Sequence, residues 1–232
     1  MFKMELAGVL IGVNNRYNYV RHQCRPFLRD TQVSPAFWVE ASEEESKQAS
    51  VLPAFGESLC LCRKICEGLL WHDVFLFHAA AIEKDGKGYL FSGRSGAGKT
   101  THTRLWQQVL GDSVSSINGD KPLLGFEGDR LMAYGSPWQG KERLGNGQSA
   151  PVEAVCFIEK NKENRLERLN TDQVMDRIFY QVLMPREAAA MEKMLSLVEK
   201  MLQAVPCYVL YCRPDEEAVQ VACEGLKEAA EC

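Results

Sequence analysis

The segment at residues 93–100 constrains this chain more than any other part of its sequence. It reads Gly-Arg-Ser-Gly-Ala-Gly-Lys-Thr and fits the P-loop pattern G-x-x-x-x-G-K-[ST]. Residues 89–92 before it predict a buried strand. Residues 101–110 after it predict a helix, because Leu105, Trp106 and Val109 fall on one helical face. The motif is informative only between a strand and a helix, so this context predicts a phosphate-binding loop in an α/β fold.

The residue types in this segment suit a polyphosphate. Glycines adopt backbone angles that other residues avoid, so successive N–H groups can point toward an anion beside the positive end of the helix. Lys99 would reach the β- and γ-phosphates, and the Thr100 hydroxyl would ligate Mg²⁺. The alternative is a glycine-rich turn with a solvated lysine. The predicted nucleotide-binding residues are Gly93, Arg94, Ser95, Gly96, Ala97, Gly98, Lys99, Thr100 and Thr101.

Size and charge exclude several classes of protein. The 232 residues allow one large domain, or one domain with a small extension, and 46% of them are hydrophobic. The net charge of −4 argues against non-specific nucleic-acid binding, which needs a positive surface. No apolar run reaches the roughly 20 residues of a membrane helix, and the first residues do not resemble a signal peptide. We therefore expect a cytoplasmic protein without a nucleic-acid or membrane partner.

The nine cysteines predict neither a disulfide framework nor a zinc site. Most of them lie in apolar, periodic segments. Cys60, Cys62 and Cys66 do not have the spacing of zinc ligands, and no second cluster completes a site. Buried free thiols in a reducing compartment explain the pattern better.

Residues 1–55 carry no chemical motif and predict a small β-rich extension. Strands are expected at 6–13, 17–20 and 37–40, a polar helix or loop at 43–48, and a break at Pro53 and Gly56. We expect this extension to pack on a second unit, a P-loop domain of residues 56–232. Whether it forms the edge of the main sheet is left open.

The rest of the chain alternates strand and helix patterns, which predicts an α/β fold with a mixed sheet flanked by helices. Residues 74–82 form a near-continuous apolar run, typical of a strand that is buried on both faces. Further strands are expected at 114–118, 122–126, 130–134, 152–158 and 207–211, and helices at 58–71, 171–183, 185–205 and after Pro214.

Two polar residues in this framework are catalytic candidates. His78 interrupts the apolar run at 74–82, and it is either a hydrogen-bonded core residue or a catalytic group. Asp120 follows Lys99 by 21 positions, a gap that fits one helix and one returning strand. A carboxylate at that strand end can hold Mg²⁺. The alternative is a turn aspartate, since Asn-Gly-Asp is a common turn sequence.

Two loops are candidate ligand contacts. In the first, Trp138, Lys141 and Arg143 lie between glycines and Pro137, which suggests an exposed substrate-binding segment; a solvated loop with a packed tryptophan is the alternative. In the second, residues 161–164 approach the guanine-reading pattern N-K-x-D, but Asn164 replaces the aspartate. A hairpin turn explains that stretch, and a GTPase is disfavoured.

Taken together, these residues resemble the HPr kinase/phosphorylase family and, more distantly, the nucleotide-binding core of phosphoenolpyruvate carboxykinase. The matching order is Phe77-His78-Ala79, the loop at 93–100, and then Asn118-Gly119-Asp120. The Ser-Pro-Trp-x-Gly-Lys segment at 136–141 is similar to that of short HPr-kinase-like proteins. The resemblance covers about residues 70–215.

The resemblance implies a kinase that uses ATP and Mg²⁺. Lys99 and Thr100 would hold ATP and the metal, Asp120 would be the metal or base carboxylate, and His78 would lie near the transferred phosphate. Lys141 and Arg143 would contact phosphates or an acidic substrate group. The family usually has two adjacent acidic residues, and this chain has Gly119 and Asp120 at those positions.

We therefore expect an ATP- and Mg²⁺-dependent kinase that phosphorylates a hydroxyl, with serine favoured, on a protein, a peptide or a small molecule. The alternative, motivated by Gly119, is a nucleotide-binding regulatory or assembly protein that has lost transfer activity. Formation of a homo-oligomer is left open. An ABC-type motor is disfavoured because this sequence lacks the L-S-G-G-Q segment.

Overall fold

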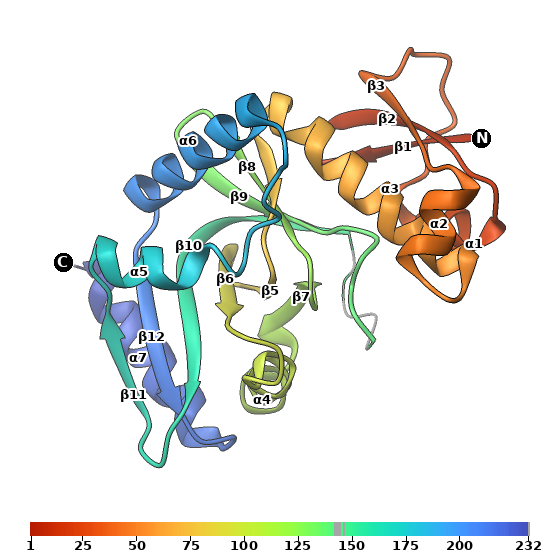
Figure 1. The fold of residues 1–232 in the computed structure, drawn as a ribbon. Helices are drawn as coiled ribbons and strands as arrows, with labels where there is room; N and C mark the ends of the chain where they lie inside the picture. The colour runs from red at the N-terminus through yellow and green to blue at the C-terminus, as the bar shows by residue number, and fades with distance from the viewer. Residues whose placement is uncertain (142–144, 146, 232) are drawn as a thin grey trace.

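The computed structural model describes residues 1–141, 145 and 147–231, which form a curled mixed sheet with helices on both faces and a separate small sheet (Figure 1). Neighbouring strands of the main sheet follow the order β4-β8-β9-β10-β6-β5-β7, with β12 beside β10 and β11 beside β12. Its strands are β4 (Val74–Leu76), β5 (Ala79–Lys84), β6 (Lys87–Ser92), β7 (Val114–Asn118), β8 (Leu123–Glu127), β9 (Arg130–Tyr134), β10 (Ser149–Lys160), β11 (Arg165–Arg168) and β12 (Cys207–Cys212).

The long strand β10 causes the sheet to curl. Its first residues pair antiparallel with β9, and its later residues pair parallel with β6 on one side and β12 on the other. The register shifts between Val152 and Ala154, where the strand passes from one set of neighbours to the other. The carboxyl ends of β6, β10 and β12 therefore lie at one edge of the sheet.

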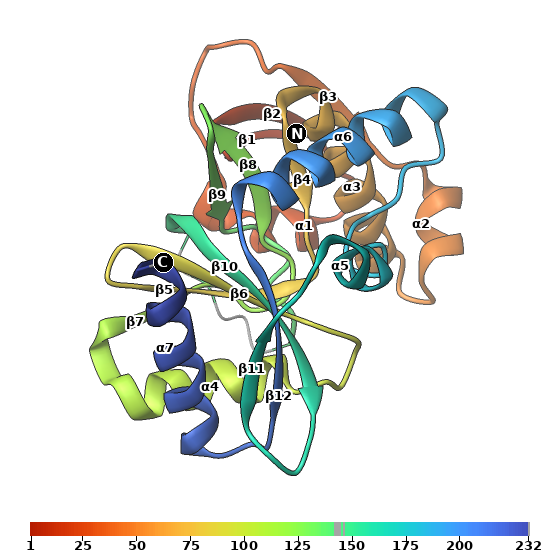
Figure 2. The same ribbon diagram turned by 90° about the vertical axis from the view of Figure 1, so that its left-hand side faces the viewer.

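Helices cover both faces of this sheet because its strands are apolar on both faces. Leu90 packs in the cluster that includes α5 (Thr171–Ile178) and α6 (Ala188–Ala204). The next residue, Phe91, packs in the cluster that includes α4 (Lys99–Leu110) and α7 (Glu216–Glu231). In Figure 2, α4 and α7 lie together at the lower side of the main sheet. The alternation follows the two-residue period of a strand.

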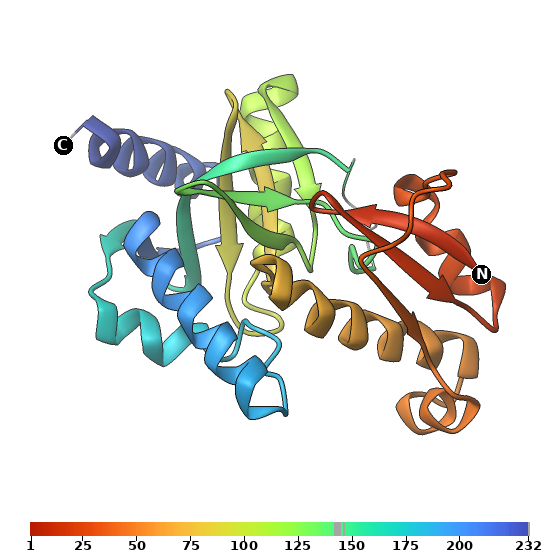
Figure 3. The same cartoon turned by 90° about the horizontal axis from the view of Figure 1, so that it is seen from above.

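The first residues form a small sheet of their own, so the possibility that they form the edge of the main sheet is excluded for this part of the chain. Figure 3 shows these strands at the end of the molecule opposite the C-terminal helix. The sheet contains β1 (Phe2–Leu6), β2 (Val9–Asn14) and β3 (Phe37–Glu40).

Two strand predictions in this region were wrong. The expected strand at 6–13 is a hairpin, because Ala7 and Gly8 both take positive φ, at 47° and 76°, and turn the chain. The expected strand at 17–20 is a short helix, α1 (Asn18–Gln23). The buried carboxylate of Glu57 accepts hydrogen bonds from the backbone N–H groups of Arg16 and Tyr17, just before this helix. A partner distant in sequence therefore fixes the helix start.

The predicted break at Pro53 and Gly56 is instead the first turn of a helix. The helices here are α2 (Glu43–Ala49) and α3 (Pro53–Leu69), and Pro53 fits the first turn, where its missing N–H is not needed. Gly56 lets α3 contact α2, since a Cβ at 56 would lie 1.9 Å from the Ser46 carbonyl oxygen. One apolar cluster joins α3, the small sheet, β4 and Trp138. The division at residue 55 remains a prediction.

Other boundaries also differ from the prediction. The expected helices at 171–183 and 185–205 are shorter, since α5 ends at Ile178 and α6 begins at Ala188. Tyr180 is 70% exposed, and Val182 instead forms an isolated bridge with Phe77. Residues 161–164 do not close a hairpin, because β11 pairs with β12 and not with β10.

Candidate functional site

The glycine-rich segment lies between β6 and α4 as predicted. Gly93, Gly96 and Gly98 all take positive φ, at 145°, 80° and 110°. Gly98 is the N-cap residue of α4, and no side chain caps this helix end. Glycine has no side chain that could accept from the first N–H groups of α4, and the helix dipole adds partial positive charge there. This end of α4 has the properties of an anion-binding site.

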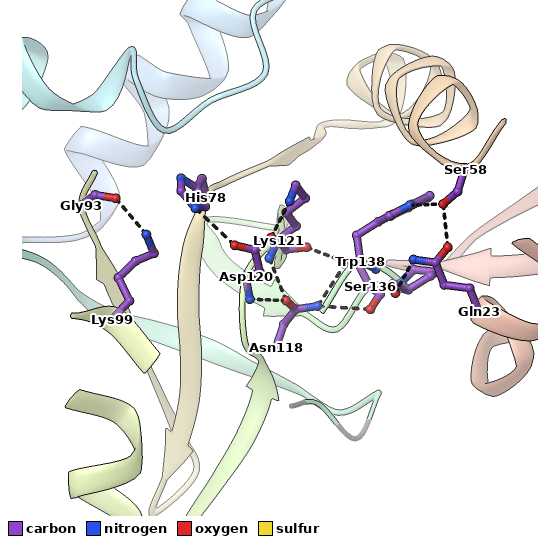
Figure 4. Close-up of polar contacts among 11 residues, drawn as sticks. Gln23, Ser58, His78, Gly93, Lys99, Asn118, Asp120, Lys121, Ser136 and Trp138 are labelled. Atoms are coloured by element: carbon purple, nitrogen blue, oxygen red, sulfur yellow. Dashed lines mark hydrogen bonds and ion pairs between the residues drawn. The ribbon is translucent and has the colours of Figure 1, made fainter. Parts of the chain in front are cut away.

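Lys99 lies over the loop that precedes it. Its Nζ donates to the Gly93 carbonyl oxygen at 2.9 Å and lies 3.5 Å from that of Arg94 (Figure 4). The residue is 8% exposed. Burial lowers the pKa of the Lys99 ammonium, and the nearby Asp120 carboxylate opposes that shift. Among the described residues, the Lys99 ammonium thus bonds to backbone carbonyl oxygens of the loop and forms no ion pair with a carboxylate.

His78 occupies a break in the apolar run at 74–82, which is not one strand as predicted. The chain pairs with β8 through β4 and then with β6 and β7 through β5. Between β4 and β5, the Phe77 N–H donates to the Pro122 carbonyl oxygen, and the His78 N–H donates to the Gln181 carbonyl oxygen at 2.6 Å. His78 is therefore not packed inside a continuous strand, and 29% of its side chain is exposed.

Asp120 lies beside His78 because the Ala79 N–H donates to the Asp120 carbonyl oxygen. The His78 Nε2 atom is 3.2 Å from Asp120 Oδ1, and Lys121 Nζ contacts Oδ2. Burial would raise the pKa of Asp120, but hydrogen bonds from His78 and Lys121 outweigh it and lower that pKa to about 2. The carboxylate is ionised at neutral pH and is a better ligand for a cation than an acceptor of protons.

The turn that carries Asp120 is fixed by Asn118, which is fully buried. Its Oδ1 accepts hydrogen bonds from the N–H groups of Asp120 and Lys121 at 2.9 and 2.8 Å. Its Nδ2 donates to the carbonyl and hydroxyl oxygens of Ser136, both at 3.1 Å (Figure 4). The Asn-Gly-Asp turn is thus an ordered part of the site.

Of the two alternatives for Trp138, an exposed substrate contact and a packed tryptophan, the structure shows the packed one. The residue is 5% exposed and belongs to the apolar cluster shared with the small N-terminal sheet. Its indole is therefore unavailable as a substrate contact. Gly140, in contrast, lies against Asp120, since a Cβ at 140 would be 3.0 Å from Asp120 Cβ. Lys141 is exposed and lines the site, and Arg143 lies outside the described residues.

A cavity of about 420 Å³ brings most of these residues together. The residues that line it are His78, Ser95, Gly96, Gly98, Lys99, Thr100, Thr101, Gly119, Asp120, Gln139, Gly140 and Lys141. Thr100 and Asp120 offer side-chain oxygens, which suit a hard divalent cation. No group of three or more His, Cys, Asp or Glu side chains in the described part of the chain forms a ready metal cluster. A metal would need phosphate or water oxygens to complete its shell.

A second cavity, of about 600 Å³, lies along the other side of the same loop. It is lined by residues of the loop (Gly93, Arg94, Ser95, Gly96, Ala97), by the end of β10 (Phe157, Ile158, Glu159, Lys160) and by the segment at the end of α5 (Asp176, Arg177, Tyr180, Gln181). Ser95 and Gly96 border both cavities. The backbone of Gln181 is bonded to His78, so the two cavities adjoin.

The sequence alone did not single out several residues of the site. Lys121 belongs to no motif, Ser136 is only the first residue of the segment at 136–141, and Asn118 is only the first residue of the Asn-Gly-Asp stretch. Their roles depend on contacts between β7, β8 and the segment at 135–141, which are distant in sequence. The signal that could have found Asn118 is the Asn-Gly-Asp spacing itself, because asparagine side chains often bond the N–H groups two and three residues on.

Comparisons with known proteins add little detail. No family model and no curated protein matches the chain. Among solved structures, it is similar to the Hpr(Ser) kinase/phosphatase from Coxiella burnetii at 12% identity and a TM-score of 0.34, over 67% of this chain and 96% of that chain. None of the described helices has the length and hydrophobicity to cross a bilayer.

Proposed function

We propose that this protein is an ATP- and Mg²⁺-dependent kinase that transfers the γ-phosphoryl group to a hydroxyl. The observation that carries the proposal is the smaller cavity. It places the uncapped end of α4, Lys99, Thr100, Asp120 and His78 around one space. N–H groups and an ammonium bind phosphates, and a hydroxyl with a carboxylate binds the metal that phosphates carry.

Each residue has a distinct part in this proposal. The N–H groups of the loop and Lys99 would hold the phosphates, and Thr100 and Asp120 would hold Mg²⁺, which neutralises charge on the phosphate oxygens when it is bound. The acceptor oxygen would bond to the γ-phosphorus as the bond to the β–γ bridging oxygen breaks. Because the low pKa of Asp120 makes it a weak base, His78 would take the hydroxyl proton. The products are a phosphate ester and ADP.

The larger cavity offers a place for the acceptor. Lys99, which reaches the β- and γ-phosphates in such loops, points toward Gly93 and Arg94, and both of these residues line that cavity. The terminal phosphate would thus lie near its border. A volume of about 600 Å³ fits a small molecule or a side chain of a peptide with its neighbours. A serine hydroxyl on a protein, a peptide or a small molecule remains the favoured acceptor.

Transfer from γ-labelled ATP tests this proposal. The assay adds the purified protein to a lysate of its own source and asks which molecule becomes labelled. Lys99→Ala should abolish labelling, and Asp120→Asn should abolish it while ATP still binds without Mg²⁺. Lys162→Ala, at an exposed lysine outside the cavity, is the matched control and should leave labelling unchanged. Equal labelling by the wild type and Lys99→Ala would overturn the proposal.

A second candidate is a nucleotide-binding regulatory protein without transfer activity. It is favoured by Gly119, which leaves Asp120 as the single carboxylate lining the cavity among the described residues. Tight Mg²⁺–ATP binding, with no label on any component of the lysate, would support this reading over the kinase.

A further inference from the structure

Trp138 connects the candidate site to the N-terminal part of the chain. Its indole Nε1 donates to Ser58 Oγ at 3.2 Å, and its backbone N–H donates to Ser136 Oγ at 3.2 Å. Ser58 belongs to α3 and is 1% exposed, whereas Ser136 lies next to the turn that carries Asp120. One buried residue therefore bonds both ends of this connection, Ser58 through its side chain and Ser136 through its backbone (Figure 4).

Gln23, at the end of α1, completes the contact on the N-terminal side. Ser58 Oγ donates to Gln23 Oε1 at 2.6 Å, and Gln23 Nε2 donates to the Pro137 carbonyl oxygen at 3.2 Å. The segment at 136–138 is thus held both by its indole and by its main chain. We refer to Gln23, Ser58 and Trp138 as the tryptophan brace.

On the other side, the braced segment holds Asp120 by two routes. Ser136 Oγ donates to the Lys121 carbonyl oxygen at 2.5 Å and accepts from Asn118 Nδ2, whose side-chain oxygen orders the Asp120 turn. Gly140, four residues after Ser136, lies in contact with the Asp120 side chain. A shift of the segment at 136–140 would therefore displace both the backbone turn that carries Asp120 and the Asp120 side chain.

Apolar packing reinforces this connection. The cluster that contains Trp138 also contains Val74 and Leu76 of β4 and Leu123 of β8, together with residues of β1, β2 and α3. His78 follows β4 by two residues, and Asp120 precedes β8 by three. Both elements that present the His78–Asp120 pair are therefore packed directly against the N-terminal part of the chain.

We propose that the N-terminal part of the chain is a positioning element for the phosphoryl-transfer site, and that it acts through the tryptophan brace on the Asp120 turn. The proposal rests on the proposed function only for its catalytic readout. Gln23, Ser58 and Trp138 are positioning residues, because none of them lines the cavity. The loop at 93–98 is not part of the brace, so binding of the phosphates and placement of the metal ligand are separable.

The test compares Ser58→Ala, which removes two hydrogen bonds of the brace, and Trp138→Phe, which removes one, with Ser46→Ala. Ser46 is a buried serine of the same N-terminal part, and its hydroxyl donates to Ser42 at 2.8 Å, away from the brace. In the brace variants we expect ATP affinity without Mg²⁺ to stay within about twofold. The Mg²⁺ concentration for half-maximal transfer should rise at least about fivefold, and kcat should fall. Ser46→Ala should lower only the melting temperature. A brace variant that behaves like Ser46→Ala would overturn the proposal.

Hydrogen exchange provides a second readout that does not require a nucleotide. The amides of Asp120 and Lys121 donate to Asn118 Oδ1, so they report whether the turn is ordered. We expect them to exchange at least about tenfold faster in the brace variants and at the wild-type rate in Ser46→Ala. Unchanged exchange in all three variants would overturn the positioning role even if the protein proves to be a kinase. Faster exchange in a protein that binds no nucleotide would preserve the structural coupling and reject only the proposed function.

Discussion

His102 makes the packing of α4 sensitive to pH. This imidazole lies on the buried face of the helix, three residues after Lys99, and is 2% exposed. Its Nε2 accepts a hydrogen bond from Trp106 Nε1 at 2.9 Å, and its ring lies edge-on to Phe91 at a centroid distance of 4.7 Å. A proton on Nε2 would place two donors against each other, so the folded protein requires the neutral ring.

The magnitude follows from the pKa. Burial lowers the pKa of His102 from 6.5 to about 4. As the pH falls, the unfolded chain binds this proton first, so the stabilisation is complete above about pH 6.5 and is lost between about pH 6.5 and 4. Each tenfold difference in proton affinity corresponds to about 1.4 kcal/mol. The titration of this one residue should therefore lower the free energy of unfolding by about 3 kcal/mol at about pH 4.

Urea unfolding at a series of pH values measures this effect. His102→Gln removes the titration but keeps an acceptor for Trp106. From about pH 7 to about pH 4, the unfolding free energy of the wild type should therefore fall by about 3 kcal/mol more than that of the variant. His22→Gln, at an exposed histidine, is the control. If the difference between wild type and His102→Gln stays constant across this range, the assigned burial of the neutral imidazole is refuted.

Three further substitutions test other contacts. Gly56→Ala would place a Cβ 1.9 Å from the Ser46 carbonyl oxygen, so it should cost at least about 2 kcal/mol, and an unchanged melting temperature would contradict this packing. Gly140→Ala should weaken Mg²⁺–ATP binding about tenfold in calorimetry, because the new Cβ presses on Asp120, and this rests on the proposed function. Its control is Gly128→Ala, which has a similar positive φ of 63° and nothing within 4 Å, and equal binding by both variants would refute the contact. Asp120→Asn removes a carboxylate whose pKa of about 2 lies below the ordinary 3.8, so its cost in urea unfolding should be about 2 kcal/mol above about pH 4 and fade toward about pH 2. A cost that does not depend on pH would show that the carboxylate is not held by its neighbours.

Local patterns predicted the central elements of the fold well. The strand before residue 93 and the helix after it depend on apolar spacing and glycines that act within a few residues, and the structure contains both as β6 and α4. The hairpin of β8 and β9 is confirmed for the same reason, because the turn residues lie between two short apolar runs.

Tertiary contacts decided the features that local patterns missed. The apolar run at 74–82 breaks at His78 because the segment at 181–182 and Pro122 bond to the backbone there, and neither is near in sequence. Residues 18–20 are helical because the buried carboxylate of Glu57 accepts from the backbone N–H groups just before them. The burial of Trp138 depends on α3, which lies 80 positions earlier at Ser58. No window of neighbouring residues contains these partners.

Isothermal calorimetry of Mg²⁺–ATP with the purified protein tests the central claim most directly. The account predicts saturable heat with one site per chain in the wild type, and its loss in Lys99→Ala at an unchanged melting temperature. No detectable heat with ATP or with any other purine nucleotide in the folded wild type would contradict both the kinase proposal and its regulatory alternative.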